Sequence, residues 1–142
     1  DPPVGRESTE VANSTDLGLD VLLDGKITTG TSPTAGRIRI WGWGAGYDGT
    51  TVRRPAGVTG SDAGLTPVKN YVTAFKLAHW IDTNATSNIT YTFAGVSLLA
   101  AFGGLILPAR WGLFVDHNTA VNLHATGGNH ELRYTVGKTL GT

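Results

Sequence analysis

Cysteine is absent from this chain of 142 residues, and so is methionine. Without cysteine, neither a disulfide framework nor a thiolate metal site can form, so the fold depends on its own core or on a partner. Long apolar runs are missing as well. The longest, "AGVSLLAAFGGLIL" at 94–107, is interrupted by two glycines and is too short to span a bilayer. The sequence therefore predicts neither a membrane segment nor a signal peptide.

Charge is scarce and balanced. The chain has eleven Lys and Arg residues and eleven Asp and Glu residues, and charged residues make up only 15% of it. A protein that neutralises phosphates needs an excess of positive charge, so this composition argues against nucleic acid as a partner. The twenty glycines are typical of a β-rich domain with many turns, or of one that packs much of its surface against neighbours.

The length suits one compact domain with a single buried core. Residues 1–15 contain two prolines, charges of both signs and little apolar content. This composition predicts an extended N-terminal arm, either disordered or lying along a partner, followed by one β-sandwich domain over 16–142. Residues 48–67 are rich in glycine and proline and show little periodicity, which predicts a long loop that makes contacts.

Alternating apolar and polar residues predict strands over most of the remaining chain. One segment, 68–81, follows a plausible helix start at Thr66, but its β-branched and aromatic content favours a strand. Ser97 is expected to cap a short helix over 98–102, which Gly103 ends in the left-handed conformation. We therefore predict an all-β, antiparallel, jelly-roll-like sandwich of about seven or eight strands with one short helix. The predicted strands are 17–24, 37–47, 68–81, 89–96 and 130–136, with a hairpin after Trp111.

The segment "RIRIWGWGAGY" at 37–47 alternates most clearly, with Ile38 and Ile40 on one face and arginines and tryptophans on the other. Arg and Trp are the residues that anchor interfaces, and Trp also stacks on sugar rings. Three outcomes stay open for the tryptophans: burial beneath a loop or a second sheet, a protein interface, or a carbohydrate platform. With two arginines of the following loop, the candidate interface residues are Arg37, Arg39, Trp41, Trp43, Arg53 and Arg54.

The register of the hairpin after Trp111 can be tested by polarity, because antiparallel partners share a face. If Val115 paired with Ala120, the core-facing side would include polar residues such as His124. If Val115 pairs with Val121 instead, apolar and polar residues separate, and the loop has three residues, with His117 at its tip. The residues expected to face the core are then Trp111, Leu113, Val115, Val121, Leu123, Leu132, Tyr134 and Val136, and those expected to face outward are Phe114, Asn122 and His124.

Three of the four histidines lie close together in the sequence, beside an aspartate. The sharpest interpretation of Asp116, His117, His124 and His130 is a metal site or a general acid/base pair. Zinc, however, needs three or four ligands converging within about 2.0–2.3 Å. The predicted register separates His117 at a tip, His124 on the outer face and His130 on the next strand. We therefore expect solvated or interface histidines, no metal site and no cofactor.

Other catalytic motifs are missing too. No serine lies in a G-x-S-x-G context, and Glu131 is the only glutamate beyond residue 10, which leaves few candidates for a carboxylate pair. The glycines of "GWGAGYDG" precede no amphipathic helix, so they do not indicate a dinucleotide site. Sequons at Asn13, Asn84 and Asn88 fit Asn/Thr-rich loops of an unglycosylated protein. We expect a protein that is not an enzyme; a metal-dependent hydrolase would require stoichiometric metal.

Two passages carry a resemblance to a known class of protein. In 13–44, "TGTSPTAG" precedes an aliphatic strand, and in 102–136, "LPARWGLFVDHNTAVNL" is followed by a closing "YTV". Together they cover about half of the chain and resemble a family of small structural proteins of tailed bacteriophages. That family has no active-site motif, so no functional residue carries over from it.

The resemblance implies a virion component, and the size and β-rich pattern make a capsid decoration (cement) protein the expected type. Such a protein is made in the host cytoplasm and binds the major capsid protein on the outer surface of the head. It works through modest contacts multiplied by symmetry and self-association, with a trimer as one arrangement. The main alternative is a carbohydrate- or receptor-binding head domain of a tail fibre or spike.

Overall fold

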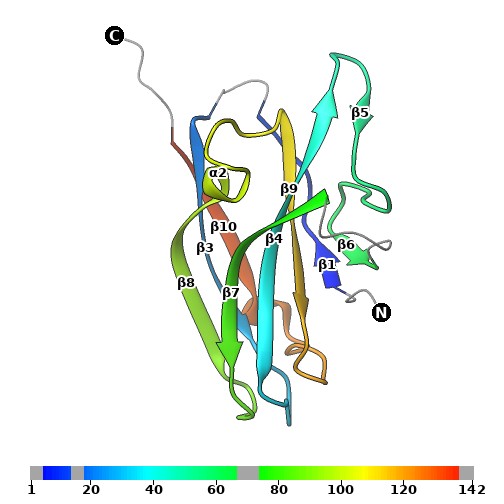
Figure 1. The fold of residues 1–142 in the computed structure, drawn as a ribbon. Helices are drawn as coiled ribbons and strands as arrows, with labels where there is room; N and C mark the ends of the chain where they lie inside the picture. The colour runs from blue at the N-terminus through cyan, green and yellow to red at the C-terminus, as the bar shows by residue number, and fades with distance from the viewer. Residues whose placement is uncertain (1–4, 14–17, 67–73, 138–142) are drawn as a thin grey trace.

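The computed structural model describes residues 5–13, 18–66 and 74–137 (Figure 1). These residues form ten β-strands, one short α-helix and one 3₁₀ turn. None of the described helices has the length and apolar content that a membrane crossing requires. In chain order the elements are β1 (Gly5–Glu7), β2 (Val11–Ala12), β3 (Asp20–Thr28), β4 (Gly36–Tyr47), β5 (Val52–Arg53), β6 (Ala63–Leu65), β7 (Phe75–Thr83), β8 (Thr90–Ser97), α2 (Leu98–Ala101), β9 (Arg110–His117), η1 (Gly127–Asn129) and β10 (Glu131–Gly137).

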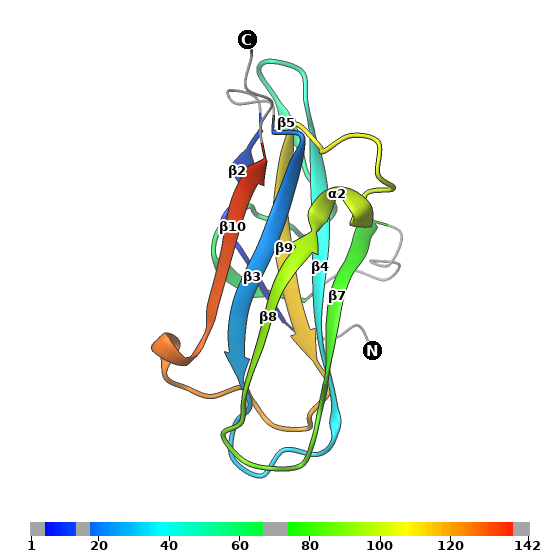
Figure 2. The ribbon, with the colours of Figure 1, turned by 90° about the vertical axis from the view of Figure 1, so that its left-hand side faces the viewer.

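The strands make two antiparallel sheets that pack face to face (Figures 1 and 2). In the larger sheet, β4 lies between β7 and β9, and β1 joins β9 to β6, while the short strands β5 and β2 pair with β4 and β9. The smaller sheet has the order β10-β3-β8. The chain changes sheet from β3 to β4, from β7 to β8, and on both sides of β9. The predicted antiparallel sandwich is confirmed, and short additional strands raise the strand number above the expected one.

The core between the sheets follows the predicted alternation. Ile38 and Ile40 of β4 and Val21 and Leu23 of β3 are buried in one cluster. Leu98 of α2 belongs to the same cluster and has no exposed surface. Burying a side chain of this size stabilises the folded state by about 1.5–3 kcal/mol, so this cluster is a main source of stability.

The predicted capped helix is confirmed. The Ser97 Oγ accepts a hydrogen bond from the Ala100 N–H at 3.0 Å, and Gly103 follows the helix with φ +91°. Asp20 adds a tie that the sequence did not indicate. One of its carboxylate oxygens accepts from the Ser97 hydroxyl at 2.7 Å and the other from the Leu99 N–H at 3.0 Å. These bonds hold α2 against the start of β3.

The other strands lie close to their predicted ranges. β3, β4 and β8 overlap the segments in which alternation was found. For the ambiguous segment 68–81, the described part forms β7 from Phe75 onward, which confirms a strand there. The rest of that prediction, 68–73, lies outside the described residues.

Part of the predicted N-terminal arm belongs to the larger sheet. β1 pairs with both β9 and β6, and β2 pairs with β9. The Ser8 Oγ accepts a hydrogen bond from the Leu113 N–H at 2.9 Å. The prediction of a separate arm is therefore wrong for 5–13, because its pairing partners come from a distant part of the chain that local composition does not reveal. Residues 1–4 and 14–15 lie outside the described residues.

The hairpin predicted after Trp111 does not form. β9 ends at His117, and its two edges are occupied by β4 and β1, so no edge is free for a following strand. Residues 121–123 form no strand. The chain instead passes the start of β4, where the Asn118 N–H donates to the Arg37 carbonyl at 3.1 Å and the Asn118 Oδ1 accepts from the Arg37 N–H at 2.6 Å. β9 thus pairs with β4 and β1, which are distant in the sequence, and not with the segment that follows it, as side-chain polarity predicted.

The predicted side-chain orientations agree with the structure better than the predicted hairpin does. Leu113 is buried between the sheets as expected, but Phe114, expected outward, is buried on the opposite face. β10 (Glu131–Gly137) is shifted by one residue from the predicted strand 130–136. Tyr134 lies opposite the buried Leu23, so it points inward as predicted. Leu132 and Tyr134 are nevertheless 36% and 48% exposed, because β10 is the edge strand of the smaller sheet.

Candidate interaction surfaces

Trp41 and Trp43 are buried on the outer face of the larger sheet, the face turned away from the smaller sheet. Residues 48–66 cover them. Gly112 lies opposite Trp43 on β9, and a side chain there would collide with the indole. Of the three outcomes that the sequence left open, the structure favours burial beneath a loop, so these two candidate interface residues form a second core. The rest of this outer cluster consists of Ala45, Val58, Leu65, Phe75 and Phe114.

Glu7 ties the covering segment to β1. Its buried carboxylate accepts hydrogen bonds from the Thr59 N–H at 3.0 Å, the Thr59 hydroxyl at 2.7 Å and the Gly60 N–H at 3.1 Å. A buried carboxylate is tolerated only when such donors satisfy it. The bonds therefore fix the position of the loop over the tryptophans.

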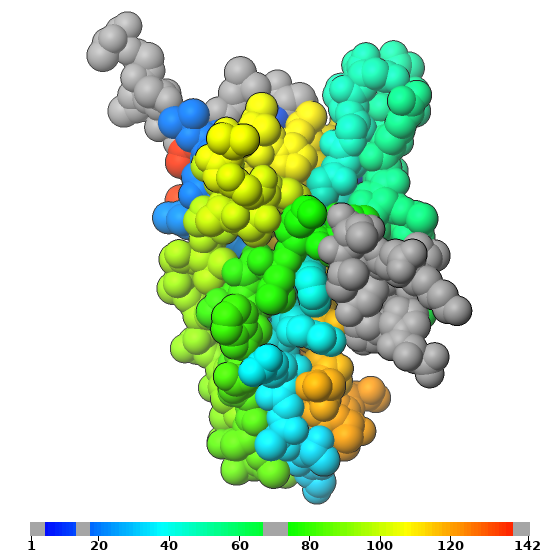
Figure 3. All heavy atoms as spheres, in the orientation of Figure 1, coloured from blue at the N-terminus to red at the C-terminus, as the bar shows by residue number. Residues whose placement is uncertain are grey.

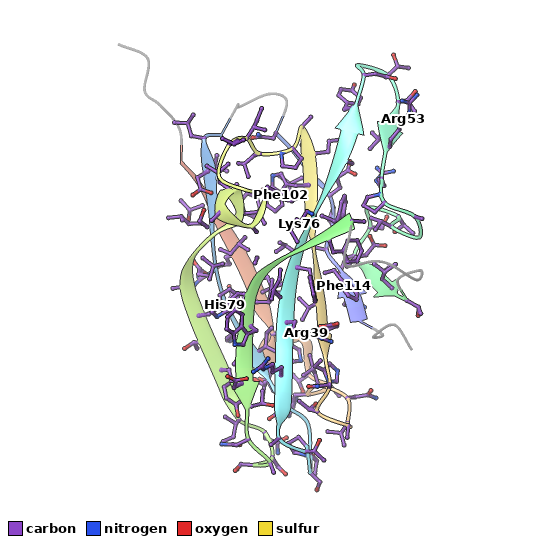
Figure 4. All side chains as sticks on the ribbon, in the orientation of Figure 1. Arg39, Arg53, Lys76, His79, Phe102 and Phe114 are labelled. Atoms are coloured by element: carbon purple, nitrogen blue, oxygen red, sulfur yellow. The ribbon has the colours of Figure 1, made fainter. Side chains whose placement is uncertain are left out.

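Glu10 makes a second tie, through two arginines. Its carboxylate accepts from the Arg54 Nε at 2.6 Å and from an Arg110 nitrogen at 2.9 Å. Burial acts to raise the pKa of Glu10, but the hydrogen bonds from Arg54 and Arg110 outweigh it, so this pKa lies below its ordinary value. Arg54, a candidate interface residue, is thus held in an ion pair with a buried carboxylate, while its own side chain stays 31% exposed. Arg53 is exposed on β5, where it forms no salt bridge with another described residue (Figure 4).

Arg39 is held by a buried partner. Its Nε and Nη2 atoms donate to the two carboxylate oxygens of Asp116, both at 2.8 Å. The Trp41 Nε1 donates to the same carboxylate at 3.3 Å, and the guanidinium carbon lies 5.8 Å from the centre of the Trp41 ring. Asp116 is fully buried, so the pair makes a fixed connection between β4 and β9. Figure 4 places Arg39 on β4, below the outer cluster.

An exposed patch lies beside this pair on β4 and β7, the strands in the middle of the surface in Figure 3. Trp80 is opposite Arg39 and is 51% exposed, and Leu77 is also exposed. Arg37 and Asp82 pair at 2.6 Å in solvent. Alternation did not single out the β7 residues, because the sequence does not show which face of that strand stays uncovered. We name this set the β4–β7 patch: Arg37, Arg39, Leu77, Trp80 and Asp82.

The end of the sandwich that carries α2 is apolar. The loop after α2 is the yellow segment beside that helix in Figure 2. In it, Leu105 and Ile106 are 92% and 77% exposed. Leu19, Leu22 and Tyr47 are also exposed, and strand pairing places them at the same end. The sequence showed this loop only as part of an apolar run broken by glycines. We name these five residues the apolar end.

The opposite end of the sandwich differs in chemistry. Its loops, 29–35, 84–89 and 118–130, are rich in Thr, Ser and Asn. None of the large apolar side chains that are exposed in the described residues lies in these loops. The molecule therefore has one apolar and one polar end.

The histidines bond to neighbouring protein groups. The His130 Nε2 donates to the His124 carbonyl at 2.7 Å, and the His124 Nδ1 accepts from the Thr126 N–H at 3.1 Å. The His117 Nδ1 lies 3.0 Å from the Thr119 hydroxyl. Burial lowers the pKa of His117, although the nearby Asp116 charge acts to raise it. Within 5–13, 18–66 and 74–137, no group of three or more His, Cys, Asp or Glu side chains could hold a metal ion.

Comparison with known proteins adds no relative. No family model, no curated protein and no solved structure matches the chain. The resemblance to tailed-phage proteins therefore stays a prediction from two passages of the sequence.

Proposed function

We propose that this chain is a non-enzymatic structural protein of a tailed-phage virion, a capsid decoration (cement) protein that binds and stabilises the head shell. The observation that carries the proposal is the contrast between the apolar end and the polar loops at the other end. Single exposed apolar residues are common on protein surfaces, but five gathered at one end are typical of a docking surface. The passages 13–44 and 102–136 support the phage context.

Docking through the apolar end suits the task of a cement protein. Leu105 and Ile106 are exposed in the loop after α2, so they can enter a recess between capsid subunits without rearrangement of the sandwich. Each copy gains modest free energy from burying this area, about 25 cal/mol per Å², and symmetry repeats the gain over the shell. The partner is the major capsid protein, and self-association of this chain strengthens attachment by linking several docking ends. The polar loops then face solvent on the outer surface of the virion.

A paired-variant experiment tests this proposal. Leu105→Asp with Ile106→Asp places charge on the apolar end, and Thr31→Asp with Ala125→Asp adds the same charge to exposed loops of the opposite end. We expect the first variant to co-sediment with purified heads lacking this protein at least about tenfold more weakly than wild type. The second variant should bind like wild type. Equal binding of both variants, each folded by circular dichroism, would contradict the proposal.

A second candidate function has its own observation. Trp80, half-exposed on a sheet face beside Arg39 and Asp82, is the kind of aromatic that stacks on a sugar ring. This favours a carbohydrate- or receptor-binding head domain of a tail fibre or spike. Glycan-array binding that disappears on Trp80→Ala would support it. Trp41→Ala and Trp43→Ala would not serve here, because those tryptophans are buried.

Copy number separates the two functions directly. A decoration protein repeats with the capsid lattice and is present in on the order of hundreds of copies per particle, whereas a fibre contributes only a few to some tens. Quantitative mass spectrometry of purified particles measures this number. A count in the fibre range would overturn the decoration proposal.

A further inference from the structure

Residues 121–130 cross the polar end of the sandwich on the way from β9 to β10, in orange in Figure 2. They lie tightly against the chain that follows β3, since a side chain at Gly30 would collide with the Asn122 carbonyl oxygen. Leu123 packs against the core between the sheets, in which Ile27 is buried. We name residues 121–130 the end segment, and conclude that it covers part of the core.

Thr28, the last residue of β3, holds the end segment through three hydrogen bonds. Its carbonyl accepts from the His124 N–H at 3.1 Å, and its hydroxyl donates to the Asn129 carbonyl at 2.9 Å. Its N–H donates to the Nδ1 atom of His130 at 3.4 Å. The imidazole of His130 thus occupies the position of a strand carbonyl, just beyond the part of β3 that pairs with β10.

The hydrogen bonds of the two histidines require neutral rings. The His130 Nε2 lies 2.7 Å from the His124 carbonyl, which can only accept, so this nitrogen carries the proton and Nδ1 is an acceptor. The His124 Nδ1 accepts from the Thr126 N–H at 3.1 Å and from the Asn129 amide nitrogen at 2.8 Å. A proton added at either Nδ1 would face an N–H group and remove the hydrogen bonds that this atom accepts.

Charged groups on the elements around the end segment are matched by groups of opposite sign. The pairs are Lys26 with Glu131 across β3 and β10, Asp24 with Arg133 on the same strands, Arg6 with Asp62, Arg37 with Asp82, and Arg39 with Asp116. None of the salt bridges within the described residues includes a histidine, so no carboxylate holds either ring in its protonated form. The other titratable group nearby is His117, whose pKa burial lowers.

The chain just before the end segment is attached by groups that do not titrate. The Asn118 N–H donates to the Arg37 carbonyl at 3.1 Å, and the Thr119 carbonyl accepts from the Thr34 N–H at 2.9 Å. Residues 118–120 therefore stay in place when a histidine is protonated, and only the part of the chain that depends on His124 and His130 is free to move.

We propose that the end segment is an acid-sensitive latch: protonation of His124 and His130 breaks its attachment to Thr28, and it moves away from the sandwich. Each ring takes up one proton from solvent at Nδ1, and the resulting cation is solvated better in the open form than against N–H groups. Opening withdraws Leu123 from the core and exposes Ile27. The latch lies at the end opposite the apolar end, so this inference does not rest on the proposed docking to a shell.

Native-state hydrogen exchange of the full chain tests the latch at the Thr28 amide. A histidine that is protonated only in the open form, near its ordinary pKa of about 6.5, favours opening about tenfold more at pH 5.5 than at pH 7.5. For two histidines, we expect the protection factor of Thr28, corrected for intrinsic exchange, to fall about a hundredfold. Because local opening exposes little surface, this exchange should not depend on low urea concentrations, unlike that of Ile40 in the core. Exchange of Thr28 with the protection factor and urea dependence of Ile40 at pH 5.5 would overturn the proposal.

Histidine variants identify the groups that titrate. His124→Asn and His130→Asn keep a side-chain oxygen close to the position of Nδ1, and this oxygen takes up no proton in this pH range. Each single variant should reduce the pH effect on Thr28 protection to about tenfold, and the double variant to less than about threefold. His79→Asn, the matched control, removes a histidine that packs on Phe93 and should keep the hundredfold effect. A double variant with the wild-type pH dependence would overturn the latch.

Nitrogen-15 NMR of the wild-type rings tests the same claim without any substitution. At pH 7.5, both His124 and His130 should show the tautomer with the proton on Nε2. A proton on Nδ1 of either ring at this pH would overturn the proposal. So would two protonated rings at pH 5.5 in a chain whose Thr28 amide remains as protected as at pH 7.5.

Discussion

The two faces of β4 are both buried, but in different ways. On the inner face, Ile38 and Ile40 meet the regular strands of a second sheet. On the outer face, Trp41 and Trp43 are covered by 48–66, a segment with only two short strands. Packing between the two sheets covers the inner face, whereas the carboxylates of Glu7 and Glu10 hold the loop that covers the outer face. The comparison shows that a loop fixed by a few buried polar contacts can complete a core as a sheet does.

The variant with the largest expected effect tests whether the outer cluster contributes as much to the free energy of unfolding as the inner cluster does. Trp43→Ala should lower the free energy of unfolding by about 3–5 kcal/mol, because it opens a cavity beneath the loop. Ile40→Ala, the inner-face reference, should cost about 2–5 kcal/mol. Urea denaturation measures both. A loss below about 1 kcal/mol for Trp43→Ala would show that the outer cover is only peripheral.

A second pair of variants compares the covered and open parts of the outer face. Asp116→Asn removes the buried charge that holds Arg39, and we expect a loss of about 2 kcal/mol. Asp82→Asn makes the same chemical change in the exposed pair with Arg37, and should change stability by less than about 0.5 kcal/mol. Equal effects in chemical denaturation would mean that burial of the ion pair does not matter here.

The tie between β1 and the covering loop is the third target. Glu7→Gln leaves one acceptor oxygen for three donors and turns an amide N–H₂ toward them, which should cost about 1–2 kcal/mol. Amide hydrogen exchange should speed up at Thr59 and Gly60 before it changes at Ile38. Uniform acceleration across the chain would contradict a local role for this carboxylate.

The smallest expected effect is a pH dependence of stability that His117, at the polar end, causes. Burial lowers the pKa of His117, so the unfolded chain binds more protons than the folded one when the pH falls through about 6.5. Stability from the neutral imidazole is therefore present above this pH and is lost below it. Denaturation at pH 7.5 and 5.5 should show a smaller difference for His117→Gln than for wild type. An unchanged difference would exclude His117 as its cause.

Sequence patterns located most strands, the capped helix and the two faces of β4, because these features follow from side-chain alternation and local backbone chemistry. They did not locate β1 and β2, whose composition is that of an arm and whose partner strand is distant. They also produced a false hairpin after Trp111, because local polarity cannot show that both edges of β9 are already taken.

The sequence likewise identified some residues of the candidate surfaces and missed others. Arg37, Arg39 and Arg53 reach the surface to different extents, but Trp41 and Trp43 do not, and Leu105 and Ile106 drew no attention in the sequence. Exposure depends on what covers a residue, and the cover comes from elsewhere in the chain.

By itself, the sequence determined that this protein is an antiparallel β-sandwich without disulfides and which side chains share a strand face, since a period of two is a local property. Tertiary structure alone decided which of those faces are buried. It placed a loop over the tryptophans, drew an apparent arm into the larger sheet and put β10 at the edge of the smaller sheet among the described strands. Such outcomes depend on long-range hydrogen bonds and packing, which no local pattern contains.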